Sequence, residues 1–153
     1  KKGIEAFPAL GLHHEMLADA YLMSGRTREA IPELETAVRL DPELALRKGY
    51  LAYGYGVTGQ KEKARAIITN LEQPSGGRGR SGVALAVAYS GLDDHARALS
   101  ALEQAVDQRD ISLTTASSLV PDKIWDPIRF DPRFIEILRR MNLLQYQQAL
   151  RGK

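Results

Sequence analysis

The chain has 153 residues, of which 21 are basic and 19 acidic, and its net charge at pH 7 is +2. This near balance argues against a surface for nucleic acid or for an anionic membrane, because both need a clear excess of Lys and Arg. The absence of cysteine excludes a disulfide framework and thiolate chemistry. No apolar run approaches the roughly 18 residues that a membrane-spanning helix needs, so we expect no membrane insertion.

The first residues, KKGIEAFPAL, have a helical pattern that is broken at Phe7-Pro8. We therefore expect residues 1–11 to be the remnant of a preceding helix. Because the chain begins with Lys-Lys-Gly rather than with Met, we also expect it to be a fragment of a longer protein.

Small and apolar positions then recur at one fixed interval along the chain. The matched sets are Leu17, Leu51 and Leu85; Ala18, Ala52 and Ala86; Tyr21, Tyr55 and Tyr89; Ala30, Ala64 and Ala98; and Leu34, Ile68 and Leu102. A period of this length is typical of a solenoid, in which a helical hairpin buries its apolar face only by stacking on its neighbours.

Within a repeat, the matched residues lie on the facing sides of two helices. Leu17, Ala18 and Tyr21 share one face of a first helix. Small alanines let the antiparallel helices approach closely, because larger side chains would overpack the contact. The predicted helices cover residues 12–23, 28–40, 42–57, 61–71, 81–90 and 94–108. Asp41-Pro42 should begin the third helix, with Asp as N-cap and Pro at the first helical position.

This pattern resembles the tetratricopeptide repeat, a family of helix–turn–helix units with the same spacing. The first repeat fills the set positions of that family with Leu17, Ala18, Tyr21, Gly25, Ala30, Leu34, Ala37 and Pro42. The second repeat departs from the pattern at Leu71 and Gly76, and the third has Asp93 where Gly is usual.

The resemblance implies an all-α fold: a right-handed αα-superhelix of about three helical hairpins plus a C-terminal capping helix. The repeats are expected at residues 12–44, 45–78 and 79–110, with a capping segment over 111–153, all within one domain. The alternative is a generic antiparallel helical bundle, which three repeats in register disfavour.

The repeat pattern ends before the last forty or so residues of the chain. We expect at most a short helix over 112–119, and then a final amphipathic helix that begins at Asp131-Pro132. Its apolar face would consist of Phe134, Ile135, Leu138, Met141 and Leu144. Because the end of a solenoid must be closed, we interpret a second group as a lid over the last repeat. That group is Ile124, Trp125, Ile128, Phe130 and Phe134. A ligand site marked by Trp125 is the alternative.

The same tail carries a second resemblance. Residues 124–134, IWDPIRFDPRF, are similar to the closing segment of certain bacterial multidomain proteins. In those proteins tetratricopeptide repeats follow a winged-helix DNA-binding domain, a nucleotide cyclase or a Ser/Thr kinase. The resemblance implies the C-terminal module of a bacterial regulator. None of the catalytic or DNA-reading motifs of those output domains is present in this sequence.

In the repeat family, one face of each first helix lines a concave groove, and the resemblance carries those positions over to this chain. The groove residues would be Leu12, Glu15, Asp19, Leu22 and Met23, then Leu46, Tyr53 and Val57, then Arg80, Val83 and Val87. Such a groove suits an amphipathic helix or an extended peptide. The alternative is that the chain's own tail or a second copy covers it.

Three glycines, Gly49, Gly54 and Gly56, lie inside the predicted helix 42–57 and weaken it by up to ~1 kcal/mol each. Either close packing of the helix backbone requires them, or the groove needs room at this point. Tyr53 lies among them and should point into the groove.

The sequence offers no pattern for a catalytic or metal site. His13-His14-Glu15 lacks the second histidine, four residues on, that a zinc-protease helix needs, so we interpret both histidines as surface residues. The glycine-rich stretch 73–82 lacks the Lys of a phosphate-binding loop, and no strand precedes it. We therefore expect no metal, no cofactor and no catalysis.

These observations predict a non-catalytic protein-interaction module that binds a protein or peptide ligand. The alternative is a self-association module that dimerises attached output domains. We expect no nucleic acid to be bound by this chain. We expect the protein to be cytoplasmic, or periplasmic if an upstream transmembrane helix precedes this chain.

Overall fold

The computed structural model describes residues 8–73, 81–110 and 123–144. Within these ranges the chain forms helices and no strand. The elements are α1 (Pro8–Met23), α2 (Thr27–Leu40), α3 (Ala45–Val57), α4 (Lys61–Glu72), α5 (Gly82–Ser90), α6 (His95–Asp107), the short 3-10 helix η2 (Lys123–Ile128) and α7 (Pro132–Arg140). The predicted fold class, an all-α helical repeat, is therefore confirmed. Across the described ranges, no helix has both the length and the apolar character that crossing a bilayer requires.

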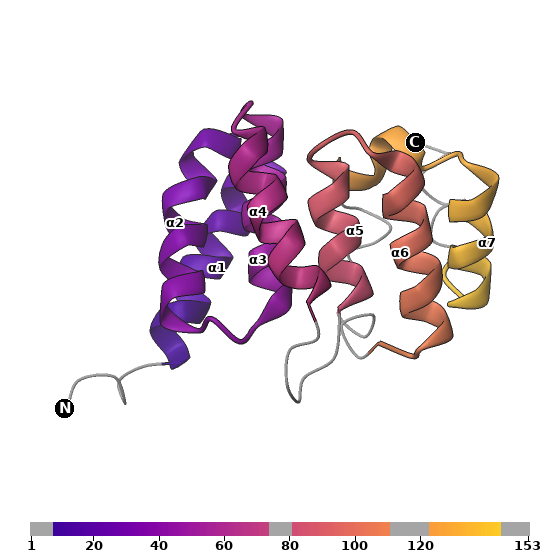
Figure 1. Ribbon diagram of the computed structural model, residues 1–153, viewed down its shortest axis with the longest axis horizontal. Helices are drawn as coiled ribbons and strands as arrows, with labels where there is room; N and C mark the ends of the chain where they lie inside the picture. Colours follow the sequence, from indigo (N-terminus) through magenta and orange to yellow (C-terminus); the bar gives the residue numbers. More distant parts are fainter. Residues whose placement is uncertain (1–7, 74–80, 111–122, 145–153) are drawn as a thin grey trace.

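The helices pack as successive hairpins followed by a closing segment. α1 packs on α2, α3 on α4 and α5 on α6, while α2 also contacts α3 and α3 contacts α5. Figure 1 shows the hairpins along the long axis of the molecule, with α1 and α2 at one end and α7 at the other. Each hairpin thus buries its apolar face against the next one, as a solenoid requires.

Two predicted helix starts were wrong. α1 begins at Pro8 rather than at residue 12, because proline is tolerated in a first turn, where its missing N–H would be unpaired in any case. α3 begins at Ala45 rather than at Pro42. Asp41 instead ends α2, its backbone N–H donating to the Ala37 carbonyl at 3.1 Å. The other predicted ends of α1 to α6 fall within one residue of those observed.

The turns inside the hairpins need a left-handed backbone conformation. Gly25 and Gly59 have φ values of +74° and +87°, which glycine adopts without steric cost. In the third hairpin Asp93 takes this place with a φ of 59°. Aspartate is one of the few residues with a side chain that tolerates this region, so the departure from the family pattern leaves the turn intact.

The repeated alanines form the centre of the core. Those of the first and second helices are all fully buried: Ala18, Ala52, Ala86, Ala30, Ala64 and Ala98. The larger matched residues Leu34, Ile68 and Leu102 are buried beside them. The positions that recur in the sequence are therefore those at which the two helices of each hairpin contact each other.

The C-terminal end of the core is closed by η2 and α7. Trp125 is 2% exposed, and its ring lies 6.1 Å from that of Phe134, which is fully buried. Ile124 and Ile128 are also buried, so four of the five predicted lid residues lie in the core. The prediction for Phe130 was wrong, because its side chain is 63% exposed.

α7 begins as predicted but is shorter than predicted. The Asp131 carboxylate accepts a hydrogen bond from the Arg133 backbone N–H at 2.8 Å, and Pro132 is the first helical residue. The helix ends at Arg140, so of the predicted apolar face Met141 lies at the C-cap and Leu144 beyond it. The helix expected within 112–119 lies outside the described residues.

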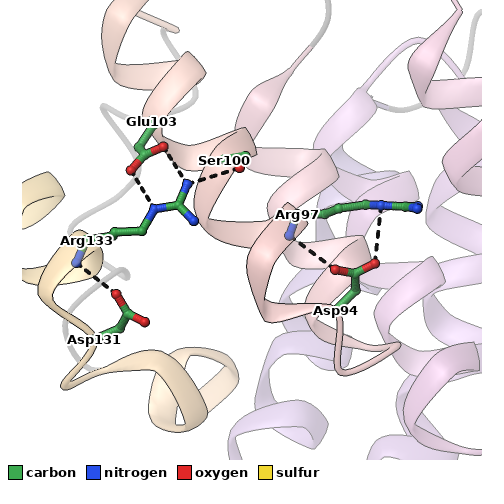
Figure 2. Close-up of polar contacts among 6 residues, drawn as sticks. All are labelled: Asp94, Arg97, Ser100, Glu103, Asp131 and Arg133. Carbon is green, nitrogen blue, oxygen red and sulfur yellow. Dashed lines mark hydrogen bonds and ion pairs between the residues drawn. The ribbon is translucent and has the colours of Figure 1, made fainter.

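Polar contacts fix α7 to α6, as Figure 2 shows. The Arg133 guanidinium donates to both carboxylate oxygens of Glu103, at 2.9 and 2.6 Å, and to the Ser100 hydroxyl at 3.0 Å. A bidentate pair of this kind sets orientation as well as distance. The hydrogen bond from Arg133 holds the pKa of Glu103 below its ordinary value. The contribution of this pair to stability is therefore present at neutral pH and is lost as the pH falls through that lowered pKa.

Candidate partner-binding groove

The predicted groove residues of the first two repeats include three exposed large apolar side chains of the first helices. Leu12 and Met23 on α1 are 51% and 68% exposed, and Val57 on α3 is 51% exposed. Met23 and Val57 are one repeat apart, so they occupy the same place at the ends of successive first helices. The sequence analysis missed Met16, which is 60% exposed; the signal was its place four residues after Leu12 on the same stripe of α1.

The acidic residues predicted for this groove are not available as free charges. The Glu15 carboxylate accepts a hydrogen bond from Nε of Arg47 at 2.7 Å, and this ion pair joins α1 to α3. Arg47 is buried, and its guanidinium also lies 3.6 Å from Asp41. Asp19 is half-buried and engaged in an interaction of its own. The surface between the first two repeats is therefore more apolar than its sequence suggests.

The predicted groove residues of the third repeat do not line an open surface. Val83 and Val87 are buried, as is every other residue of α5, and η2 contacts this helix. α5 is apolar on all sides, which is typical of a helix enclosed by its neighbours. Arg80 lies outside the described residues.

Two of the three glycines of α3, Gly49 and Gly56, serve close packing of the helix backbones rather than room for a ligand. A Cβ placed on Gly49 would lie 2.6 Å from the Ala84 carbonyl oxygen, and one on Gly56 would lie 2.3 Å from that of Gly91. A Cβ on Gly91 would in turn lie 2.5 Å from the Tyr53 Cα atom. The backbones of α3 and the α5 end therefore touch, and no peptide fits between them at these points.

The three remaining groove residues are half-buried. Leu22, Leu46 and Tyr53 are each partly exposed, and Leu22 and Tyr53 pack against the hydrophobic core. Tyr53 also makes an interaction of its own. Four large apolar side chains on α1 and α3 are thus exposed, Leu12, Met16, Met23 and Val57, and we call this set the open groove.

The packing tyrosines join successive repeats through their hydroxyl groups. Tyr55 donates a hydrogen bond to Glu35 on the second helix of the preceding hairpin, and Tyr89 donates likewise to Glu72. Burial and the hydrogen bond to Glu35 raise the pKa of Tyr55 to about 12, and burial and the hydrogen bond to Glu72 raise the pKa of Tyr89.

We expect Tyr55 and Tyr89 to ionise above pH 10 in an alkaline titration of the folded chain followed by phenolate absorbance. An unfolded chain releases their protons near pH 10, whereas the folded chain retains them. The free energy of unfolding should therefore fall as the pH rises from about 10 towards 12. Glu35→Gln should bring the transition of Tyr55 to lower pH, because a neutral amide does not repel the phenolate. Release of the Tyr55 and Tyr89 protons near pH 10 in the folded chain would contradict this description.

The adjacent histidines belong to the surface and the hairpin contact. Nδ1 of His14 lies 2.5 Å from a Glu33 carboxylate oxygen, which joins α1 to α2. His13 is exposed. Among the residues that the structure describes, no group of three or more His, Cys, Asp or Glu is placed to hold a metal ion. Most of the glycine-rich stretch 73–82 lies outside those residues.

Comparison with known proteins agrees with this hairpin geometry. Residues 14–44 and 83–110 match the tetratricopeptide repeat. The first match covers most of α1, all of α2 and the connection to α3, and the second covers α5 and α6. No curated protein and no solved structure matches the chain. Tetratricopeptide repeats generally mediate protein–protein interactions and are typically non-catalytic, so a protein partner is the function class that this match supports.

Proposed function

We propose that this chain is a non-catalytic interaction module that binds a helix or an extended peptide of a partner protein in the open groove. The observation that carries the proposal is the exposure of four large apolar side chains, Leu12, Met16, Met23 and Val57, on the first helices of two successive repeats. Soluble proteins rarely leave such side chains clustered on one surface unless something binds there.

The contacts around the groove define the ligand further. Arg47 neutralises Glu15, so the surface favours the apolar face of an amphipathic helix over a strongly charged peptide. The close contact of α3 with Gly91 and the burial of α5 limit the ligand to the first two repeats. A ligand of two or three helical turns, with apolar residues at i, i+3 and i+4, fits a surface of this extent.

We also propose that the chain forms part of a larger bacterial regulatory protein. The support for this context is the similarity of residues 124–134 to the closing segment of such proteins. In that setting the module would bring a partner to an attached output domain, or hold output domains together.

The test is affinity capture from a lysate of the source organism, with the native chain and a Met23→Glu, Val57→Glu double variant compared side by side. Each glutamate places a charge in the apolar contact, which should weaken binding by about tenfold or more. Leu44→Glu is the matched control, because Leu44 is also exposed but lies at the opposite end of α3 from Val57.

A protein retained by the native chain and by the control, and lost by the double variant, supports the proposal and names the ligand. Equal retention by all three chains would contradict it. Because both substituted residues are more than half exposed, the double variant should melt at about the same temperature as the native chain. A melting curve of each chain therefore checks that lost binding is not caused by loss of the fold.

A further inference from the structure

Successive first helices meet at two junctions, α1 with α3 and α3 with α5, and the second junction is closed by backbone atoms. A Cβ placed on Gly49, Gly56 or Gly91 would lie 2.6 Å or less from a backbone atom across this second junction. Backbones packed this closely cannot separate without losing the dispersion contacts along the whole junction. The second and third hairpins are therefore joined as one tightly packed unit.

The first junction, between α1 and α3, carries side chains where the second has these glycines. The matching places, one repeat earlier in the chain, hold Glu15, Leu22 and Val57. These side chains keep the backbones of α1 and α3 from approaching as closely as those of α3 and α5 do. α3 accordingly contacts the first hairpin mainly through α2.

A single buried arginine fills this wider junction. The side chain of Arg47, from the first turn of α3, is 7% exposed. Its Nε donates to the Glu15 carboxylate on α1 at 2.7 Å, and its Nη1 lies 3.6 Å from the Asp41 carboxylate at the end of α2. Gly11 on α1 leaves room for the guanidinium, since a Cβ there would lie 3.1 Å from Nη1. We call these contacts of Arg47 the arginine clamp.

The arginine clamp has no counterpart at the second junction. The place of Arg47 one repeat later is taken by Ser81, whose hydroxyl accepts a hydrogen bond from the Ala84 backbone N–H and so caps α5. The tyrosine hydrogen bond to a glutamate of the preceding hairpin, in contrast, is present at both junctions, from Tyr55 and from Tyr89. The arginine clamp is thus the polar contact that distinguishes the first junction.

We propose that the arginine clamp sets the spacing between α1 and α3, and that α1 moves away from α3 when the clamp opens. The pivot is the contact of α2 with α3, where Tyr55 donates to Glu35. Opening separates charged groups, and water that enters hydrates the guanidinium and the carboxylate, which offsets part of the lost attraction. Opening of the second junction would instead expose the apolar side chains of α5, which water does not stabilise.

This movement changes the open groove, because the groove spans the same junction. Met23 lies on α1 and Val57 on α3, so the distance between them depends on the position of α1 relative to α3. Arg47 is therefore a positioning residue, which acts on ligand binding by holding the two sides of the groove at one spacing. This role in binding rests on the proposed function, whereas the movement itself does not.

Distances between spin labels measure the movement directly, because the chain has no cysteine and can be labelled at two introduced ones. Exposed His13 on α1 and Glu62 on α4 form a pair across the first junction, and Glu62 with exposed Ala96 on α6 forms a pair across the second. An Arg47→Met, Glu15→Gln double variant removes the clamp and leaves no unpaired buried charge. In this variant the first distance distribution should broaden and shift to longer distances, while the second should stay as in the native chain.

Lys48→Met is the matched control. It removes a cation from the next residue of α3, whose Nζ donates to Asn70 at 3.1 Å within the second hairpin and so does not cross the first junction. Both distance distributions of this control should equal those of the native chain. An unchanged first distribution in the double variant, or equal broadening of both distributions, overturns the proposal. If the double variant does not fold, Glu15→Gln alone, which keeps an acceptor for Nε, should broaden the first distribution to a smaller extent, and its failure to do so also overturns it.

Binding separates this inference from the proposed function. The protein that the native chain captures should bind the Arg47→Met, Glu15→Gln variant about tenfold more weakly, because α1 stands at the binding spacing in only a fraction of the molecules. Equal binding of that protein by both chains would contradict the role of Arg47 at the groove. If the native chain captures no protein, the proposed function fails, and the spin-label distances still decide whether the arginine clamp holds α1.

Discussion

Trp125→Ala is expected to lower the free energy of unfolding by about 3–5 kcal/mol, the cost of removing a large aromatic side chain from a packed core. The Trp125 ring is 2% exposed and stacks on Phe134, so its loss leaves a cavity that η2 and α7 cannot fill. For a chain of this length the melting temperature should fall by roughly 6–20 °C. Chemical unfolding, followed by circular dichroism of the helices, measures the change.

The control for this prediction is Phe130→Ala. Phe130 lies in the same segment and was also expected in the lid, but it is 63% exposed, so its removal should change stability by no more than about 0.5 kcal/mol. Equal effects of the two substitutions would mean that η2 does not close the core as described. A small effect of Trp125→Ala with altered ligand binding would instead favour the alternative, a ligand site at this residue.

Gly56→Ala is expected to destabilise the protein by about 2–3 kcal/mol through overpacking. The new Cβ would lie 2.3 Å from the carbonyl oxygen of Gly91 and 2.5 Å from its carbonyl carbon, and backbone atoms cannot move aside as a flexible side chain can. This cost exceeds the gain of up to ~1 kcal/mol that alanine brings to a helix interior. Denaturant unfolding of the variant and the native chain measures the difference.

Gly11→Ala provides the matched control for the glycine prediction. Its Cβ would lie 3.1 Å from Nη1 of Arg47, which is a side-chain atom rather than backbone, so a displacement of only a few tenths of an ångström relieves the contact. The helical gain and the small shift nearly cancel, so stability should change by less than about 1 kcal/mol. A Gly56→Ala chain as stable as Gly11→Ala would contradict the close contact of the α3 and α5 ends.

The fold was predictable because the repeat encodes it locally. Alanines that recur once per repeat mark the contacts inside each hairpin, and glycines mark the turns. The start of α3 was not predictable in the same way. Asp41-Pro42 has the residues of a helix start, but in the structure Asp41 ends the preceding helix. Cap residues give only a local preference for where a helix starts, and here the packing of α2 and α3 overrides that preference.

The groove was predictable only in part, because burial depends on contacts between repeats. Leu12, Met23 and Val57 are exposed, as groove residues must be. Val83 and Val87 are the third-repeat counterparts of Glu15 and Asp19, but both are buried because α5 is enclosed on all sides. The ion pair of Glu15 with Arg47 joins residues that are 32 apart in sequence, so no local sequence pattern predicts it.

Methionine oxidation in the presence and absence of the captured partner tests the proposed groove most directly. The chain has three methionines, of which Met16 and Met23 lie in the open groove, while Met141 lies at the end of α7 and packs against the core. We expect the partner to slow the oxidation of Met16 and Met23 by peroxide and to leave that of Met141 unchanged. Unchanged oxidation of Met16 and Met23 in the complex would contradict binding at the open groove.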